Sequence, residues 1–275
     1  QVFAAAADGR VRHIHALWVL PSGWAARALA RATGTTYSVW ALGSDIWSLG
    51  RLPLVRRLLG EVAREAQAAY ADGVQLAKDA QAICGRQFEF LPSCRALAGE
   101  RRMPVAAAPP YRLVYLGRWH PNKGVDLMLD ALGQLDDGDW QRIAEVHVAG
   151  GGPLRGLVEQ QVERLRAAGR PLRLSGYLDR RAAEAALAEA DRLLLPSRIE
   201  SIPVVFSDAL AYDLPVVAMP VGDLPSLLAD GVGWLADEVS AAAFARALRR
   251  SLATQPAAAS IALLRRQFDV ARIAA

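Results

Sequence analysis

The sequence predicts an α/β fold made of two Rossmann-like domains, each with a parallel sheet covered by helices. The first observation is the length of 275 residues, which is enough for two modest domains with cores of their own. The second is the alternation of short apolar runs with helical patterns along the chain. The third is a proline-rich stretch without periodicity at residues 91–110, which reads as a linker. We therefore expect a first domain with its linker at residues 1–108 and a second domain at residues 109–275.

The first domain has fewer elements than a complete unit of this kind. It opens on a strand that resembles a mid-domain strand and begins without methionine, which favours a chain lacking its natural beginning; a short relative is the alternative. Ser22 is expected to cap the first helix. The predicted elements are a strand at 11–18, a helix at 21–33, a strand at 36–41, a helix at 51–70, and a short strand, helix and strand within 73–90.

The second domain repeats strand and helix in regular alternation, the signature of a parallel sheet. Its strands are expected at residues 111–116, 143–149, 172–175, 192–195 and 216–218. Its helices are expected at residues 125–135, 154–168, 180–190, from Pro203 onward, 224–228, 241–253 and 260–273.

Composition excludes several classes of protein. Hydrophobic residues make up 53% of the chain, yet no apolar run approaches the roughly 20 residues that span a bilayer. The net charge of +4 is small, which argues against nucleic acid as a partner. Cys84 and Cys94 match no metal or redox spacing, and the start of the chain lacks a basic leader, so we expect a cytoplasmic protein without a metal site.

The stretch from residue 197 to residue 208 carries the strongest functional pattern. Pro203 opens a helix at the end of a predicted strand, where its missing N–H costs nothing. The amides near that helix start form a ready anion site, and Glu200 and Asp208 lie on either side of its first turn as acceptors for sugar hydroxyls. The expected amide donors are Ser201, Ile202, Val204 and Val205.

Two further loops follow predicted strands. The loop between Gly117 and Gly124 holds Arg118 and Lys123, which can direct a guanidinium and an ammonium at one phosphate group. Lysine is rare in this chain, which otherwise uses arginine. The glycines at 150–152 permit a close backbone approach to a phosphate or a sugar, a weak signal taken alone.

Residues 111–236 resemble the C-terminal domain of the group-one, retaining glycosyltransferases of GT-B architecture, in which two Rossmann-like domains face a cleft. The resemblance rests on four motifs: GR…NKG (Gly117, Arg118, Lys123, Gly124), GGGPL (150–154), SGYL (175–178) and ES.P….D (Glu200, Ser201, Pro203, Asp208). It implies that Arg118 and Lys123 bind the donor diphosphate and stabilise the leaving charge, and that Glu200 holds the donor sugar. It further implies donor contacts from Gly117, Gly151, Gly152, Ser201, Ile202, Val204 and Val205, base contacts from Tyr177 and Leu178, a ribose contact from Asp208, and neither a metal nor a cofactor.

Two positions depart from the family pattern. Asp208 stands where the family has a second glutamate, which shortens the reach of the carboxylate by about 1.5 Å. Leu42 stands where an active-site histidine often precedes the Gly-Ser-Asp of the first domain. The cleft candidates that remain in that domain are His15, Gly43 and Asp45, with a core position as the alternative for His15.

The helix expected from Arg51 to Arg64 mixes arginines with leucines and valine. It is typical either of a solvated amphipathic helix or of one that lies on an anionic membrane surface, which would place the protein at the inner face of the membrane.

The sequence therefore favours a retaining glycosyltransferase that moves a sugar from a nucleotide diphosphate sugar to a glycan, a lipid-linked or a small-molecule acceptor. One alternative is a sugar-nucleotide-binding protein without turnover, favoured by Leu42 and the short first domain. Another is a GT-B epimerase, which needs further acids and a histidine that the sequence does not offer.

Overall fold

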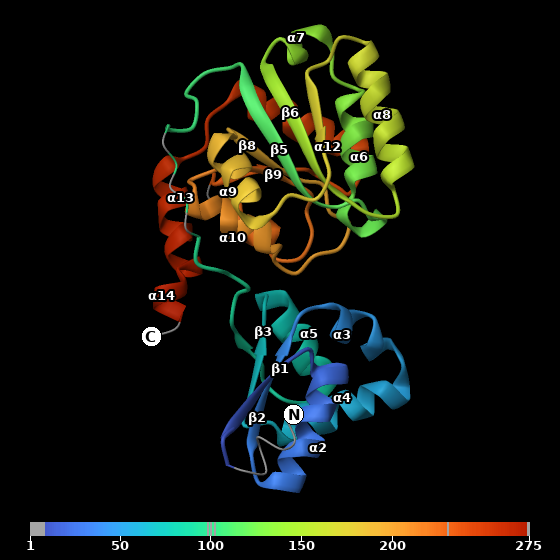
Figure 1. Ribbon diagram of the computed structural model, residues 1–275, viewed down its shortest axis with the longest axis vertical. Coiled ribbons are helices and arrows are strands. Elements are labelled where there is room, and N and C mark those ends of the chain that lie inside the picture. The colour runs from blue at the N-terminus through green and yellow to red at the C-terminus, as the bar shows by residue number, and fades with distance from the viewer. Residues whose placement is uncertain (1–8, 98, 100, 102, 230, 274–275) are drawn as a thin grey trace. The chain divides into compact units, whose positions relative to one another are not determined.

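The computed structural model describes residues 9–97, 99, 101, 103–229 and 231–273, which form two compact units. The first unit is Gln1–Ser93 and the second is Cys94–Ala275, and each holds one parallel sheet with its own core (Figure 1). The division falls before the segment 94–108, which the sequence placed with the first domain. Within the second unit, Arg101 of that segment donates hydrogen bonds to the carbonyls of Tyr212 (2.8 Å) and Ala190 (2.7 Å), and the amide of Ala106 donates to Asp191 (2.8 Å).

The first unit has a four-stranded sheet in the order β1-β2-β3-β4, with every neighbouring pair parallel. Its strands are β1 (His13–Leu17), β2 (Thr36–Ala41), β3 (Ala68–Ala71) and β4 (Glu89–Phe90). Its helices are α2 (Trp24–Thr33), α3 (Ser44–Trp47), α4 (Pro53–Glu65) and α5 (Val74–Cys84), with the turns η1 (Val19–Gly23) and η2 (Leu49–Arg51). About four strands were expected here, and four are present in the described part.

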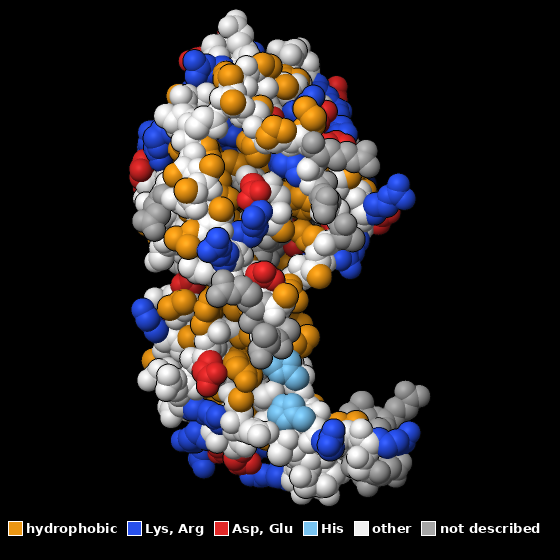
Figure 2. Space-filling view, turned by 90° about the vertical axis from the view of Figure 1, so that its left-hand side faces the viewer, with side chains coloured by type: hydrophobic (Ala, Val, Ile, Leu, Met, Phe, Trp, Pro, Cys, Tyr) orange, Lys and Arg blue, Asp and Glu red, His pale blue; other side chains and the backbone are white. Residues whose placement is uncertain are grey.

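One face of this sheet packs on the helices, and the other carries exposed and partly buried polar and aromatic side chains. Ala16 of β1 and Val39 of β2 are buried in the core. His13 and His15 point to the opposite face of β1, because successive side chains of a strand alternate, and both are exposed. Two histidines lie side by side on the surface of this unit among hydrophobic side chains (Figure 2).

Three expectations for the first unit are wrong. Ser22 is not the helix cap, because the chain passes through the turn η1 and α2 begins after Gly23 without a side-chain cap. The helix expected at 51–70 ends at Glu65, because Arg86 donates to the carbonyls of Ala63 (2.7 Å) and Arg64 (3.3 Å) at the helix end. The residues that follow join the sheet as β3, so the segment 73–90 holds only α5 and β4.

The second unit has a six-stranded parallel sheet in the order β10-β9-β8-β5-β6-β7. Its strands are β5 (Tyr111–Arg118), β6 (Ile143–Gly151), β7 (Leu172–Ser175), β8 (Arg192–Leu195), β9 (Val216–Ala218) and β10 (Gly233–Leu235). Its helices are α6 (Val125–Leu132), α7 (Asp137–Trp140), α8 (Arg155–Ala167), α9 (Arg180–Glu189), α10 (Val204–Ala211), α11 (Leu224–Leu227), α12 (Ala241–Ala253), α13 (Ala258–Arg265) and α14 (Val270–Ile273), with the turns η3 (Pro121–Lys123) and η4 (Arg266–Phe268).

The expected strands and helices of the second unit are present, with three differences. The short helix α7 and the strand β10 were not expected; a capping box between Asp136 and Asp139 marks the start of α7. The helix expected at 260–273 is interrupted by η4, where the ring of Phe268 is buried against Phe206 of α10.

The strand order defines a switch point between β5 and β8. From β5 the chain builds the sheet through β6 to β7, then returns to the other side of β5 and continues through β8 and β9 to β10. Parallel α/β sheets bind ligands outside the carboxyl ends of their strands at such a point. The loops that follow β5 and β8 are therefore the first place to look for a site.

A pH-dependent ion-pair network is predicted to stabilise the first unit. Hydrogen bonds from Arg27 (2.6 Å) and Arg31 (2.7 Å) lower the pKa of Glu65 to about 2 from its usual value near 4.5. A depressed pKa contributes stability above the unfolded value, which is lost as the pH falls through the folded value. Because Glu65 is partly exposed, we expect Glu65→Gln to lower the free energy of unfolding at pH 7 by about 1 kcal/mol.

The difference between the two proteins should disappear as the pH falls from about 4.5 to about 2, as measured by urea unfolding at a series of pH values. Glu163→Gln is the control, because Glu163 is exposed and lies 3.8 Å from its nearest arginine nitrogen. A difference that persisted unchanged at pH 2 would contradict the assignment.

Candidate functional site

The loop after β5 packs directly against the end of β8. Gly124 closes this loop with a positive φ of 65°, and a Cβ there would lie 1.9 Å from the carbonyl oxygen of Pro196. A residue with a side chain could not adopt this backbone without displacing one of the two loops. The contact brings Lys123, at the end of η3, beside the residues that follow β8.

Arg198 ties the two loops together. Its amide donates to the carbonyl of Asn122 (2.8 Å), and its guanidinium donates to the carbonyl of Pro121 (2.6 Å). The same guanidinium binds both carboxylate oxygens of Asp126 in α6, at 2.8 and 2.6 Å. Although burial opposes the change, these bonds lower the pKa of Asp126. The carboxylate therefore stays ionised and keeps its ion pair with Arg198.

The ammonium of Lys123 forms an ion pair with the carboxylate of Glu200 across the two loops. Ser197 donates a second hydrogen bond to the same oxygen of Glu200 (3.2 Å). Both partners are largely shielded from water, with 30% of the Lys123 side chain and 12% of the Glu200 side chain exposed. Two residues that the sequence assigned to one site, 77 positions apart, are thus in contact at the switch point.

The start of α10 lies directly after Glu200. Pro203 precedes the helix with a φ of −63°, so it is the N-cap residue and the helix proper begins at Val204. Within the described residues the four expected amide donors have no hydrogen-bond acceptor; they are Ser201, Ile202, Val204 and Val205. The hydroxyl of Ser201 is buried and also has no partner in that part of the chain. Free amides at the positive end of a helix are suited to bind an anion.

A second glycine positions the Glu200–Ser201 peptide. Gly222 has a φ of 55°, and a Cβ there would lie 2.3 Å from the carbonyl oxygen of Ser201 and 2.4 Å from that of Glu200. The turn before α11 therefore supports the peptide from below. The sequence analysis did not single out Gly222, and no signal besides the glycine itself marks it.

The glycines after β6 allow close packing of the backbone. A Cβ on Gly150 would lie 1.9 Å from the carbonyl oxygen of Gly117, and a Cβ on Gly152 would lie 2.6 Å from that of Trp119. The ring of Tyr177 lies on Gly151, and its hydroxyl donates to the carbonyl of that glycine (2.7 Å). Gly151 thus positions Tyr177, which is 68% exposed, while Leu178 packs on the core.

Arg118 ends β5 with an exposed side chain. Its carbonyl accepts a hydrogen bond from the buried hydroxyl of Tyr115 (2.9 Å), which fixes the backbone at the strand end. Among the described residues the guanidinium itself has no partner, so its N–H donors remain available to a ligand.

Asp208 is held by a residue that the sequence analysis did not identify. The guanidinium of Arg95 donates to both of its oxygens, at 3.0 and 2.5 Å, and only 2% of the Asp208 side chain is exposed. Arg95 belongs to the segment expected to be a linker, where no motif marks it.

The three candidates of the first unit have structural contacts. Both oxygens of Asp45 are engaged, by the amides of Val19 (2.7 Å) and Leu42 (3.2 Å), and burial raises the pKa of this carboxyl. Gly43 has a φ of 102°, and its carbonyl accepts hydrogen bonds from the first turn of α3.

His15 lies on the face of the first unit's sheet that carries exposed side chains. Its Nδ1 and the Nε2 of His13 both lie within hydrogen-bond distance of the Ser38 hydroxyl, at 2.7 and 2.9 Å. Partial burial, with a smaller contribution from His13, lowers the pKa of His15. His15 is therefore hydrogen-bonded on this face and is not a residue of the core.

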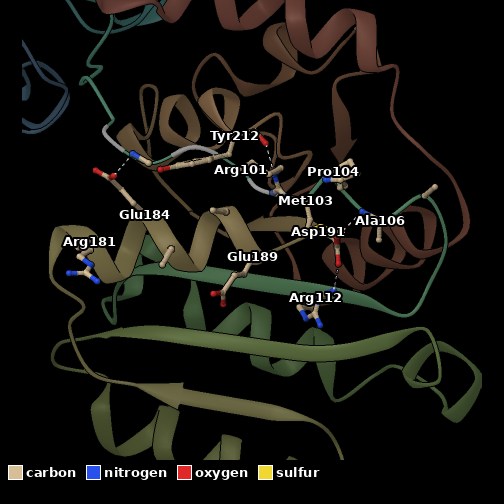
Figure 3. Close-up of a pocket in the computed structure, with 15 residues that line it drawn as sticks. Arg101, Met103, Pro104, Ala106, Arg112, Arg181, Glu184, Glu189, Asp191 and Tyr212 are labelled. Carbon is tan, nitrogen blue, oxygen red and sulfur yellow. Dashed lines mark hydrogen bonds between the residues drawn. The ribbon is translucent and has the colours of Figure 1, made fainter.

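A cavity of about 1430 Å³ lies at the other end of the second sheet (Figure 3). It is lined by Arg112 at the start of β5, by Asp191 just before β8, by α9 and by residues 99, 101 and 103–107. The carboxylate of Asp191 accepts from the amides of Ala106 and Arg112, both at 2.8 Å, which joins that segment to the sheet. Because it opens at the amino ends of the strands, this cavity is separate from the loops described above.

Two searches of the described residues complete the description. No group of three or more histidine, cysteine, aspartate or glutamate side chains in that part of the chain is arranged to hold a metal ion. No helix there has the length and the apolar character needed to cross a bilayer.

Comparison with known proteins places the site in context. Residues 110–254 match the family model of the glycosyl transferases group 1. The chain is 27% identical over 252 residues to a putative teichuronic acid biosynthesis glycosyltransferase of Bacillus subtilis, covering 86% of this chain and 60% of that protein. It is 36% identical over 172 residues to a D-inositol 3-phosphate glycosyltransferase of Geodermatophilus obscurus, covering 60% of this chain and 38% of that protein. The chain thus spans less than two thirds of the length of these curated relatives.

Solved structures show the same fold. Anabaena HepE in complex with UDP-glucose matches with a TM-score of 0.79 and 19% identity, covering 99% of this chain and 78% of that one. A sucrose-phosphate synthase from Thermosynechococcus elongatus matches with a TM-score of 0.76 and 20% identity, covering 98% of this chain and 73% of that one. The fold is that of the GT-B glycosyltransferases, as the sequence predicted.

The packing of the two loops is open to a direct test. Gly124→Ala should lower the free energy of unfolding by about 1–3 kcal/mol, because the added Cβ meets the Pro196 carbonyl and the positive φ becomes strained. Gly156→Ala in α8 is the matched control: nothing lies within 4 Å of its added Cβ, and alanine should stabilise the helix by up to about 1 kcal/mol. Thermal and urea unfolding of the two variants would refute the packing role of Gly124 if both changes proved equally harmless.

Proposed function

The chain belongs to the glycosyl transferases group 1 family, and on this premise we propose that it transfers a sugar from a nucleotide diphosphate sugar to an acceptor hydroxyl, with retention of configuration. One observation carries the proposal: the Lys123–Glu200 ion pair lies at the switch point of the sheet, beside the free amides of α10. A cation, an anion site and a hydroxyl acceptor are thereby present together. These are the groups that a sugar diphosphate requires.

The ion pair gives a simple exchange on binding. In the free protein, Lys123 and Glu200 neutralise each other in a partly shielded place. The donor diphosphate would take the ammonium of Lys123, joined by the guanidinium of Arg118 and the amides of α10. Glu200 would then turn its carboxylate to the hydroxyls of the donor sugar, which are hydrogen-bond donors that a carboxylate accepts well.

Catalysis follows from the same charges. As the bond between C1 of the sugar and the diphosphate oxygen breaks, its electron pair passes to the leaving phosphate. Arg118, Lys123 and the helix amides stabilise that developing charge, so the proposal assigns no metal to the site. A phosphate oxygen then accepts the proton of the acceptor hydroxyl as that hydroxyl attacks C1 from the same face. No residue of the chain needs to act as the nucleophile in this scheme.

The donor and the acceptor are proposed by class. HepE, a solved protein of the same fold, holds UDP-glucose, so uridine diphosphate sugars are the first donors to test, with guanosine diphosphate sugars beside them. The relative from Bacillus subtilis is described as a teichuronic acid biosynthesis enzyme, which supports a glycan or a lipid-linked acceptor for this chain.

Helix α4 and the residues before it support a contact with an anionic membrane. Leu54 is 86% exposed and Leu52 is 55% exposed, so two large apolar side chains project from this surface. Arg56, Arg57 and Arg64 line one shallow hollow beside the end of α5. Arginines next to exposed leucines are typical of helices that lie at a membrane surface.

A liposome experiment tests this contact. We expect the protein to sediment with phosphatidylglycerol vesicles at low salt, and the pair of changes Leu54→Ser and Arg56→Gln to reduce the bound fraction severalfold. Leu263→Ser removes another exposed leucine, in the second unit, and should leave binding unchanged. Equal sedimentation of all three proteins, or none at low salt, would end the membrane proposal.

A second candidate function is sugar-nucleotide binding without turnover. Leu42 offers no hydrogen-bonding side chain at the family's histidine position, and both oxygens of the nearby Asp45 are engaged by backbone amides. Calorimetry with UDP and GDP beside an assay of donor hydrolysis and transfer separates the candidates. Binding without either reaction would favour this second function.

The transfer proposal predicts a large effect at Lys123. Lys123→Ala should lower the rate of transfer or donor hydrolysis about 100-fold to 1,000-fold, as expected for the loss of one preorganised donor, and Arg118→Ala should act similarly. Lys78→Ala is the control, since Lys78 is the other lysine of the chain and lies exposed on α5 of the first unit. Normal turnover by Lys123→Ala would show that the assigned roles are wrong.

A further inference from the structure

The contact between Arg95 and Asp208 links the segment after Ser93 to helix α10. The Nε of Arg95 donates to one carboxylate oxygen (3.0 Å) and its Nη2 donates to the other (2.5 Å). Arg180 of α9 holds the same segment through the carbonyl of Ala96, and Leu97 packs against the core. The guanidinium of Arg95 is therefore fixed by Asp208, and the segment that carries Arg95 is fixed by Arg180 and by the core.

Asp208 lies on the α10 face that carries two of the free amides. It follows Val204 by four residues and Val205 by three, so the three residues share one side of the helix. A rise of about 1.5 Å per residue places Asp208 about 6 Å along the axis from Val204. A group joined to a diphosphate that is bound at the amides would therefore lie within reach of Asp208 and of Arg95, which binds it.

The Asp208 carboxylate is not open to a ligand in this arrangement. Only 2% of its side chain is exposed, and both of its oxygens are engaged by Arg95. Arg95, by contrast, is 44% exposed. A guanidinium has five N–H donors, and since Asp208 takes two of them, three remain for a ligand.

We propose that Arg95 is the residue of this site that contacts the donor ribose, and that Asp208 acts through Arg95 by orienting it. The inference rests on the proposed function, because it assumes a nucleotide diphosphate at the start of α10. In this scheme the ribose hydroxyl oxygens accept hydrogen bonds from the guanidinium. A free carboxylate at the same place would instead accept hydrogen bonds from those hydroxyls. Because aspartate is one methylene shorter than glutamate, the acid at position 208 leaves room for the arginine.

The two arrangements predict opposite results for one variant. Arg95→Gln removes the guanidinium and frees the carboxylate of Asp208. If Arg95 contacts the ribose, this change should weaken binding of UDP to the full chain about tenfold or more, as measured by calorimetry. If Asp208 is the true contact, the same change should leave the affinity unchanged or raise it.

Two further variants and a control complete the set. Arg95→Lys keeps the charge near Asp208 but loses the fork of donors, and should bind UDP between threefold and tenfold more weakly than the wild type. Asp208→Asn should weaken binding less than Arg95→Gln does, because the guanidinium remains. Arg246→Gln is the control, because Arg246 of α12 is half exposed and pairs with Asp237, away from the segment that carries Arg95, so this variant should bind UDP as the wild type does.

Deoxynucleotides identify the ribose as the group that is read. The wild type should bind 2′-deoxy-UDP or 3′-deoxy-UDP more weakly than UDP, and this penalty should shrink in Arg95→Gln. Thermal melts of each variant show whether the fold is retained, and Arg95→Lys serves as the test if Arg95→Gln does not fold.

Each outcome has a separate meaning. A wild type that binds neither UDP nor GDP would refute the proposed function, and the role of Arg95 with it. A wild type that binds UDP would refute the role of Arg95 alone if Arg95→Gln, or Arg95→Lys in its place, bound UDP as well as the wild type. The role of Arg95 would also be refuted if the loss of affinity for deoxy-UDP relative to UDP stayed as large in that variant as in the wild type.

Discussion

The candidate site depends on the close packing of two loops at the centre of the second sheet. Gly124 allows the loop after β5 to approach the Pro196 carbonyl at the end of β8, where any side chain would collide with it. Arg198 then joins the loops through a backbone carbonyl and through Asp126. Lys123 and Glu200 come from different loops of the sheet, so their ion pair depends on this contact.

The order of the strands decides that these two loops are neighbours. β5 lies between β6 and β8, so the chain leaves it on one side and returns on the other. At that reversal, loops separated by some 77 residues of sequence meet at the carboxyl edge. The free amides at the start of α10 point their positive end into the same region. The strand order of the parallel sheet therefore brings both signs of charge to one place. Gly124 allows the two loops to pack closely, and Arg198 joins them by hydrogen bonds.

The segment after Ser93 is part of this unit and not a passive connection. Arg95 binds Asp208, Arg101 binds three carbonyls at the ends of α9 and α10, and the amide of Ala106 binds Asp191. Each contact satisfies a buried polar group of the helices or the sheet, which would otherwise carry a desolvation cost. The segment is thus attached to the helices and the sheet by hydrogen bonds that involve side chains, and not by strand pairing.

The sequence by itself determined the α/β class, most elements of the second unit and several residues that lie together at the candidate site, among them Lys123 and Glu200. These features depend on local signals: periodicity marks the strands and helices, Pro203 marks the start of α10, and glycines mark the loops after β5 and β6. Even the wrong expectations were local: the helix expected up to Tyr70 ends at Glu65, where the distant Arg86 binds two carbonyls and the residues that follow pair with β2.

Only the tertiary structure decided which charges face each other. Arg95 on Asp208, Arg198 on Asp126 and the amides of Val19 and Leu42 on Asp45 join residues that no spacing connects. An arginine or an aspartate reads the same in sequence whether it meets water or a partner. The partner is set by packing between elements far apart in the chain, and the pattern of a single element holds no record of it.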